Sequence, residues 1–193
     1  MKDLLVVVDM VNGFIHFGAL ADKNINKITP TIVSLIEKAK EQGMDIVAFK
    51  DCHTINDIEF KTFPPHCLKG TWESDLIPEL KPYEKDMVII PKNTTNGFIT
   101  NTFKNIAIKN KYDRVFVVGC CTDICVKDFT GSYLTFIKKL NRHTKIIVFE
   151  DACYTFDGEN HNAEAEHKKA LSYLKHKGAY IATAKQCVSQ KER

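Results

Sequence analysis

The chain has 193 residues, of which 44% are hydrophobic and 26% charged, and its formal net charge is +3. These values predict one globular domain over residues 1–193, and the scattered lysines and short apolar runs exclude a nucleic-acid-binding stripe, a signal peptide and a membrane span. We therefore expect a cytoplasmic protein that has neither nucleic acid nor membrane as a partner and whose seven cysteines are free thiols.

Short β-branched runs alternate with helical patterns along the chain. In chain order the expected elements are a strand at Leu4–Val8, a helix at Ile28–Gln42, a strand at Asp45–Phe49, a strand at Met87–Ile90, a helix at Phe98–Ile108, a strand at Arg114–Val118, a helix at Thr122–Leu140, a strand at Lys145–Phe149, a helix at Ala163–Lys177 and a strand at Ala179–Ala182. This alternation predicts an α/β doubly wound fold, with helices on both faces of a six-stranded, mostly parallel sheet. The long irregular segment 51–83 is expected to be functional.

Reactive side chains follow four of these strands. Asp9 follows the first strand, Asp51 and His53 the second, Lys92 the third, and Cys125 lies in the loop after the fourth. In open parallel sheets, ligands bind beyond the carboxyl ends of the strands. We therefore expect one edge of the sheet to carry an acid, a metal-binding pair, a lysine and a thiol.

Cys125 is the expected nucleophile. The thiolate is the reactive form, and the amide dipoles of the predicted helix together with the Lys92 ammonium are expected to lower the pKa of the thiol. Asp9 could take the thiol proton and pass it to a leaving amine, so no histidine is needed as the base. In isolation Cys125 reads as a buried small hydrophobe, Asp9 as a turn residue and Lys92 as surface charge. Their joint placement at neighbouring strand ends favours chemistry.

The irregular segment also carries a candidate metal site. Asp51 and His53 are two residues apart and share a face of the chain, and His66 returns behind two prolines, with Glu59 before it. Carboxylates with imidazoles suit zinc, iron or manganese better than magnesium or calcium. We expect one divalent metal, Zn²⁺ first, with Mn²⁺ and Fe²⁺ as alternatives. The competing interpretation makes Asp51 and His53 loop caps and His66 a surface residue.

Aromatic residues near these motifs could stack on a flat heteroaromatic substrate, although ordinary core packing explains each of them equally well alone. They are Phe14, Phe60, Phe63 and Trp72. Four further histidines have no partner pattern and are expected at the surface: His16, His143, His161 and His167.

Several sequence blocks together resemble a known family over nearly the whole chain. They are Val7-Val8-Asp9-Met10-Val11-Asn12-Gly13-Phe14, Asp51-Cys52-His53, the segment Phe63–Thr71, Lys92, and Gly119-Cys120-Cys121-Thr122-Asp123-Ile124-Cys125-Val126. The last block is the most specific, because it resembles a nucleophile loop with Thr-Asp ahead of the cysteine. The blocks resemble the isochorismatase-like cysteine hydrolases, and within them the nicotinamidases, which also act as pyrazinamidases.

The resemblance implies the catalytic residues. The triad maps onto Asp9, Lys92 and Cys125. The peptide bond between Cys120 and Cys121 is expected to be cis, and the backbone N–H groups of Cys121 and Cys125 are expected to form the oxyanion hole. A second set of residues is implied to hold metal and substrate. The metal ligands map onto Asp51, His53 and His66, with Glu59 as an additional acidic ligand, and the substrate ring is expected between Phe14 and Phe63.

The resemblance thus implies a metal-dependent amidase that hydrolyses nicotinamide to nicotinate and ammonia through a cysteine thioester, as in NAD salvage. The alternative enzyme is a related amidase or ureide hydrolase with a different small amide. Two further classes are a non-catalytic metal or small-molecule binding module and a structural subunit with a redox-sensing, cysteine-rich rim. The full metal set favours the nicotinamidase. Assembly into a homo-oligomer is left open.

Overall fold

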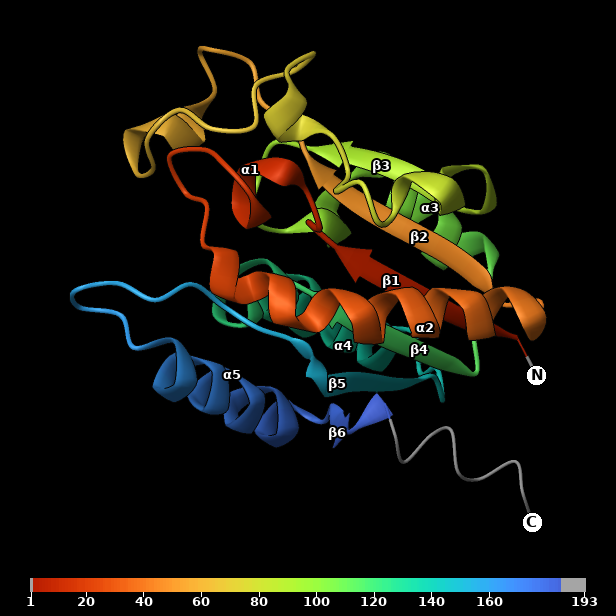
Figure 1. Ribbon diagram of the computed structural model, residues 1–193. Coiled ribbons are helices and arrows are strands. Elements are labelled where there is room, and N and C mark those ends of the chain that lie inside the picture. The colour runs from red at the N-terminus through yellow and green to blue at the C-terminus, as the bar shows by residue number, and fades with distance from the viewer. Residues whose placement is uncertain (1, 185–193) are drawn as a thin grey trace.

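The computed structural model describes residues 2–184. These residues form a six-stranded sheet in the order β3-β2-β1-β4-β5-β6, and every pairing in it is parallel (Figure 1). The strands are β1 (Asp3–Val8), β2 (Asp45–Asp51), β3 (Val88–Lys92), β4 (Arg114–Gly119), β5 (Lys145–Cys153) and β6 (Tyr180–Ala182). The predicted six-stranded α/β fold is confirmed. The six cysteines in this part of the chain are free, and Cys187 lies outside the described residues.

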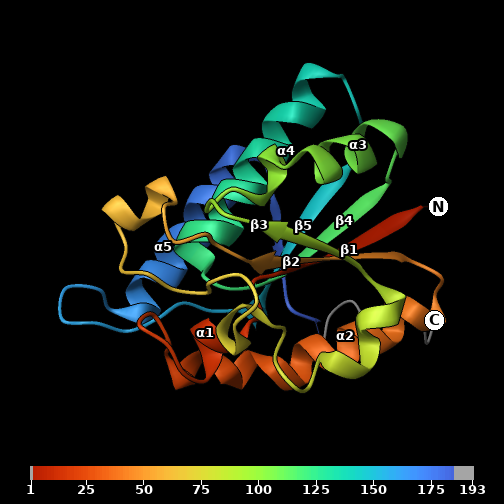
Figure 2. The same cartoon turned by 90° about the horizontal axis from the view of Figure 1, so that it is seen from above.

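Helices cover both faces of the sheet, with α1 and α2 on one side and α3, α4 and α5 on the other (Figure 2). They are α1 (Asn12–Ile15), α2 (Thr29–Glu41), α3 (Asn101–Lys109), α4 (Lys127–Lys139) and α5 (Ala163–Lys177), and short 3₁₀ helices join them at Lys23–Ile28, Ile58–Lys61, Trp72–Ser74, Lys81–Asp86 and Gly97–Ile99. Of the helices that the structure describes, none is both long and apolar enough to cross a membrane.

The predicted helix at Thr122–Leu140 differs from the structure in its first turn. Residues Thr122–Val126 form a π-helix that leads into α4, with the Val126 amide donating to the Cys121 carbonyl at 3.1 Å. π-Helical turns are rare and occur often at functional sites. Apolar periodicity could not have shown this, because one inserted residue barely alters the spacing.

The central strand β1 is buried along its whole length. Leu4, Val6 and Val8 face the layer of α3, α4 and α5, whereas Leu5 and Val7 face the layer of α2. This alternation follows from the two-residue repeat of a strand, and full burial of each such side chain contributes about 1.5–3 kcal/mol. Packing on both faces therefore fixes the position of the carboxyl end of β1.

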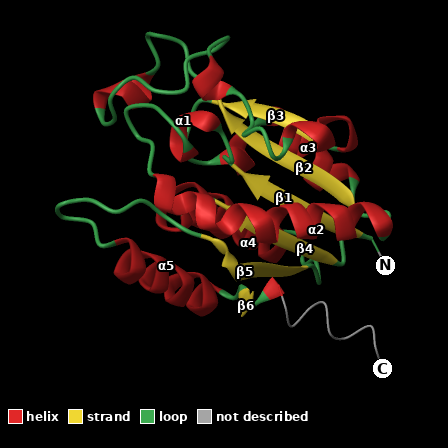
Figure 3. Cartoon of the chain, viewed as in Figure 1, coloured by secondary structure: helices red, strands yellow, loops and turns green. Residues whose placement is uncertain are grey.

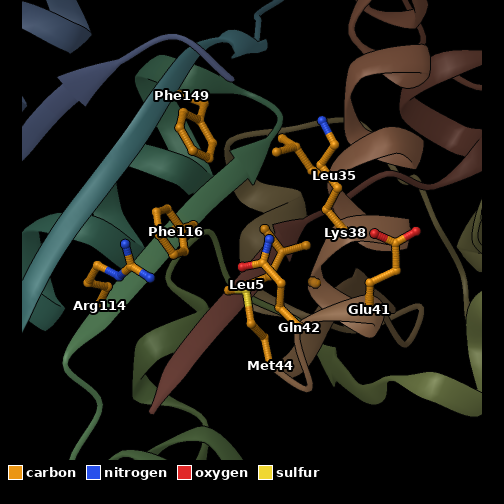
Figure 4. A pocket seen from close by; sticks show the side chains of 10 residues that line it. Leu5, Leu35, Lys38, Glu41, Gln42, Met44, Arg114, Phe116 and Phe149 are labelled. Carbon is orange, nitrogen blue, oxygen red and sulfur yellow. The ribbon is translucent and has the colours of Figure 1, made fainter. Parts of the chain in front are cut away.

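A hollow of about 190 Å³ lies between α2 and the sheet (Figure 4). Its walls include residues at the amino ends of the strands, such as Leu5 in β1 and Arg114 in β4, beside Leu35 and Lys38 from α2. Among the described residues that line it, none is a cysteine or a histidine. The long loops lie at the opposite edge, where the strand arrows end (Figure 3). The reactive side chains belong to that carboxyl edge.

Candidate active site

Three strand ends place the charged residues of the site. Asp9 follows β1 with a left-handed φ of 51°. Asp51 and Lys92 are the last residues of β2 and β3, and they are paired neighbours in the parallel register. Because β1, β2 and β3 are adjacent, these three side chains meet at one end of the sheet. The placement expected from the strand order is therefore present.

Lys92 is the centre of this group. Its Nζ lies 2.8 Å from Asp9 Oδ2, 2.7 Å from Asp51 Oδ1 and 3.9 Å from Cys125 Sγ. All four side chains are buried. One ammonium group thus serves two buried carboxylates and touches the sulfur, so the expected convergence of thiol, acid and lysine is observed.

Burial governs the ionisation of these groups. Burial raises the pKa of Asp9 from 3.8 to about 6, although the Lys92 ammonium opposes the rise. Burial also raises the pKa of the Cys125 thiol well above its usual range, although Lys92 opposes this shift too. The expected lowering of the pKa of Cys125 is therefore wrong in direction, because desolvation of the thiolate outweighs the nearby positive charge. Cys125 rests as a thiol, and Asp9 is the nearby group whose pKa suits a base.

The nucleophile loop connects β4 to Cys125. Gly119 has a φ of +115°, and a Cβ atom there would overlap the carbonyl oxygen of Val8, so only glycine lets the loop leave the sheet here. The peptide bond between Cys120 and Cys121 is cis, as the resemblance implied. Within the described part of the chain, the Cys121 amide makes no hydrogen bond. It is available to a ligand, and its oxyanion role stays a prediction.

The candidate metal centre consists of Asp51, His53 and His66. Asp51 Oδ2 lies 2.9 Å from His53 Nε2 and 3.0 Å from His66 Nε2. One ligand atom from each of the three residues lies within 4.8 Å of the others. Glu59 lines the adjacent cavity but does not belong to this three-residue group. The ligand role of Glu59 stays a prediction.

The hydrogen bonds on the far side of the two imidazoles show that these residues fit a metal ion. His66 Nδ1 lies 2.7 Å from the Pro64 carbonyl oxygen, which can only accept, so Nδ1 carries a proton. His53 Nδ1 lies 3.1 Å from the Asp57 carboxylate. In their neutral forms both rings therefore turn an Nε2 lone pair toward the same Asp51 oxygen. Either protons on the two Nε2 atoms or one metal ion bound by all three residues would satisfy these contacts, and two imidazoles with a carboxylate suit a divalent transition metal.

A cavity of about 350 Å³ opens above Cys125. Phe14 and Phe63, the two predicted substrate residues, both line it, and their ring centroids lie 5.6 and 6.3 Å from that of His66. The full lining comprises Phe14, Ala19, Leu20, Ala21, Asp22, Asp51, Glu59, Phe63, His66, Thr95, Cys121, Ile124, Cys125, Phe156, Asp157 and Gly158. The cavity thus joins aromatic walls, a metal-type cluster and a thiol.

Comparison with known proteins defines the family. The isochorismatase domain family matches residues 3–186. The chain belongs to the isochorismatase family. Nicotinamidase 1 of Arabidopsis thaliana is 30% identical over 207 residues, which span 93% of this chain and 84% of that protein. The expected membership of a hydrolase family is therefore confirmed.

Two solved structures extend the likeness of this isochorismatase-family enzyme. The pyrazinamidase of Pyrococcus horikoshii in complex with zinc is 28% identical, has a TM-score of 0.78, and covers 95% of this chain and 99% of its own. The N-carbamoylsarcosine amidase of Thermoplasma acidophilum is 30% identical, has a TM-score of 0.79, and covers 95% of this chain and 97% of its own. Both are similar along almost their full length.

The sequence-based prediction did not include some of the residues that shape this site. Asp57 accepts hydrogen bonds from both the amide and the hydroxyl of Thr54 and also contacts His53 Nδ1, so it orients a metal-type histidine. Phe156, Asp157 and Gly158 line the cavity from the loop after β5. In the sequence, the Asp157-Gly158 pair is typical of a turn. The sequence around it does not indicate that this loop reaches the site.

The surface position expected for His167 is wrong. His167 is buried, and its Nδ1 lies 2.9 Å from Thr122 Oγ1. His161 is only partly exposed, and its Nε2 lies 2.8 Å from Asp123 Oδ2. Both histidines thus contact the Thr-Asp pair ahead of the nucleophile. The α5 periodicity does place His167 on the buried face, whereas His161 precedes the helix and had no such signal.

Proposed function

We propose that this isochorismatase-family hydrolase is a metal-dependent amidase that converts nicotinamide to nicotinate and ammonia through a thioester on Cys125. One observation carries the proposal: Lys92 contacts Asp9, Asp51 and Cys125, and Asp51 and Cys125 line a cavity that also contains His66 of the metal-type cluster. The similarity to a nicotinamidase and to a zinc-containing pyrazinamidase supports this substrate class.

The first half of the reaction forms the thioester. Cys125 Sγ attacks the carboxamide carbon as its proton passes to Asp9, the buried carboxylate whose pKa is raised to about 6. The backbone N–H groups of Cys121 and Cys125 stabilise the resulting oxyanion, and one such donor is typically worth ~3–4 kcal/mol. The carbon–nitrogen bond then breaks as Asp9 returns the proton, and ammonia leaves.

The second half releases nicotinate. Asp9 takes a proton from water, the hydroxyl oxygen bonds to the thioester carbon, and the carbon–sulfur bond breaks. Asp9 then returns the proton to the Cys125 sulfur, which restores the resting state. Lys92 remains an ammonium throughout, because its contacts with Asp9 and Asp51 hold its pKa above the usual range despite burial. It offsets the negative charge that moves between Asp9 and the sulfur.

In this proposal, the residues of the cavity wall bind the pyridine ring. Phe14 and Phe63 offer aromatic faces on which a flat ring can stack. Asp51, His53 and His66 would hold the ion, with zinc first, and a bound divalent ion supplies a Lewis acid for the ring nitrogen. A free metabolite amide as substrate agrees with the predicted cytoplasmic location and a role in NAD salvage.

The alternative substrate is a different small amide or a ureide. The similarity to N-carbamoylsarcosine amidase supports it, since that enzyme is as similar in sequence as the nicotinamidase. The aromatic walls beside the metal-type cluster favour a heteroaromatic amide instead. A substrate panel separates the two: we expect nicotinamide and pyrazinamide to show kcat/KM at least about tenfold above N-carbamoylsarcosine and ureidoacrylate. The opposite order would make the ureide hydrolase the correct assignment.

The nucleophile is tested by Cys125→Ala in an ammonia-release assay. We expect turnover to fall by at least about 10⁴-fold, because the variant lacks the sulfur that forms the proposed thioester, while metal content is retained. Cys153→Ala is the matched control, since Cys153 is also a buried free thiol but lies outside the cavity, and it should retain activity. Ammonia release by Cys125→Ala at the wild-type rate would refute the nucleophile assignment.

A further inference from the structure

The loop between β5 and α5 forms one wall of the cavity but has no part in the reaction described above. We call residues 154–161 the rim loop, and its Phe156, Asp157 and Gly158 line the cavity. We propose that His161 is a positioning residue, which as an imidazolium bound to Asp123 holds Phe156 in the cavity wall and thereby sets the affinity for a flat substrate ring. This role rests on the proposed function.

A single imidazole fixes both the ring and the backbone of Phe156. The His161 and Phe156 rings are stacked with centroids 3.9 Å apart and an angle of 4° between their planes. His161 Nδ1 also lies 2.9 Å from the Phe156 carbonyl oxygen. Two backbone hydrogen bonds between Gly158 and His161, of 2.9 and 3.1 Å, close the turn between them. Phe156 therefore cannot keep this position unless His161 does.

The two nitrogens of His161 both face acceptors. A carbonyl oxygen can only accept, so Nδ1 must carry a proton, and Nε2 faces Asp123 Oδ2 at 2.8 Å. A neutral ring would set its Nε2 lone pair against a carboxylate. Both contacts are satisfied together only when the ring is an imidazolium.

The charged groups around His161 favour that state. Asp123 faces it from the π-helix and Glu166 from α5, together with the Phe156 carbonyl. Burial lowers the pKa of His161, but the hydrogen bond and charge of Asp123, then the carbonyl and Glu166, outweigh it and raise the pKa above 6.5. His161 is fully protonated at pH values below the ordinary histidine pKa of 6.5, and it loses its charge as the pH rises through its raised pKa.

The contact between His161 and Asp123 joins the rim loop to the π-helix that contains Cys125. Asp123 lies two residues before Cys125, and its partner His161 anchors one side of the rim loop. On the other side, the Asp157 amide donates to Asp22 Oδ2 at 2.8 Å, and Asp22 also lines the cavity.

The rim loop is also held at Tyr154, whose carbonyl accepts from the Thr122 amide and whose ring lies beside His167, and at Asp157, whose carboxylate accepts from the Ala163 amide. Among these contacts, the pair of His161 with Asp123 is the one that holds Phe156 through an ionisable side chain. Loss of this contact should weaken substrate binding and leave the chemical step on Cys125 intact.

The first test is the pH dependence of KM for nicotinamide. For the wild type we expect KM to rise about tenfold as the pH passes from below to well above the His161 pKa, with kcat changed by less than about threefold. His161→Phe keeps the aromatic stack but carries no charge, so its KM should be high and flat across the same range. Exposed His143 provides the matched control His143→Phe, whose profile should follow the wild type.

A second measurement does not depend on turnover. NMR titration of the His161 imidazole should show a pKa that falls by about one unit in Asp123→Asn, which is about tenfold in proton affinity. An unchanged His161 pKa in Asp123→Asn, or a wild-type KM in His161→Phe, would overturn the proposal. A second equivalent of bound zinc that disappears in His161→Phe would also overturn it, because a metal would then bridge these residues. Failure of the wild type to hydrolyse nicotinamide contradicts the proposed function and leaves the titration result standing.

Discussion

At the scale of single residues, the site depends on one cation. Lys92 contacts both Asp9 and Asp51 within 2.8 Å, and the three side chains are buried. Desolvation of each charge is costly, and the attraction to Lys92 offsets this cost only because both contacts are short. The raised pKa of Asp9 shows that burial prevails at that carboxylate. Lys92 therefore affects both the stability of the fold and the reactivity of the site.

Removal of this cation should destabilise the fold. We expect Lys92→Met to lower the free energy of unfolding by about 3–5 kcal/mol, because it leaves two buried carboxylates without a counter-charge. The double variant Asp9→Asn/Lys92→Met should recover part of this loss. Lys50→Met is the control: Lys50 pairs with half-exposed Asp75 at 3.2 Å, and its loss should cost less than about 1 kcal/mol. Urea denaturation measures all three, and equal losses for Lys92→Met and Lys50→Met would contradict the argument.

The raised pKa of Asp9 predicts an acid limb in the activity profile. Asp9 must be ionised to take the Cys125 proton, so kcat/KM should fall as the pH decreases through the pKa of Asp9 in the free enzyme. Burial places that pKa at about 6, and a divalent cation at Asp51 would shift it back toward 3.8. We therefore expect a midpoint between these values in a pH–rate measurement. A midpoint in the neutral range would instead indicate a histidine base.

At the scale of elements, the sequence predicts the strands well and the connections poorly. The apolar run Leu4–Val8 could only be a buried strand, so the carboxyl-end positions of Asp9, Asp51 and Lys92 followed from the strand order. The rim loop could not be predicted, because its contact between His161 and Asp123 spans 38 residues and depends on how α5 packs. Local patterns record burial within one element, whereas such contacts depend on the arrangement of several.

Gly119 tests the link between β4 and the nucleophile loop. We expect Gly119→Ala to destabilise the protein by at least ~3 kcal/mol, because its left-handed φ disfavours a side chain and its Cβ would overlap the Val8 backbone. Gly131→Ala is the matched control, since nothing lies within 4 Å of a Cβ at that position in α4. It should stabilise the helix by roughly 0.5–1 kcal/mol. Chemical denaturation compares the two, and equal effects would show that crowding at β1 does not matter.

At the scale of the whole molecule, the fold brings the site together at one edge of a rigid sheet. The metal-type residues come from two places: Asp51 and His53 at the end of β2, and His66 within the segment before β3. That segment contains no α-helix and joins β2 through a bridge between His53 and Leu68. The candidate ligands could be proposed from their residue types and spacing, but the contact of one of them, Asp51, with Lys92 could not, because it depends on the order of the strands. A bound ion would tie this segment to the sheet.

Metal binding should therefore stabilise the whole protein. At zinc concentrations about a thousandfold above Kd, binding to the folded state alone contributes about 4 kcal/mol, which raises Tm by about 8–16 °C for a chain of this size. Chelation should reverse the shift, as seen by differential scanning calorimetry. His66→Ala should abolish it by removing one Nε2 from Asp51, whereas His16→Ala should retain it, because His16 Nε2 lies near Glu79 instead, at 3.9 Å. A zinc-induced shift of equal size in both variants would mean that the ion binds elsewhere, and the absence of any shift in the wild type would remove the metal from the proposed mechanism.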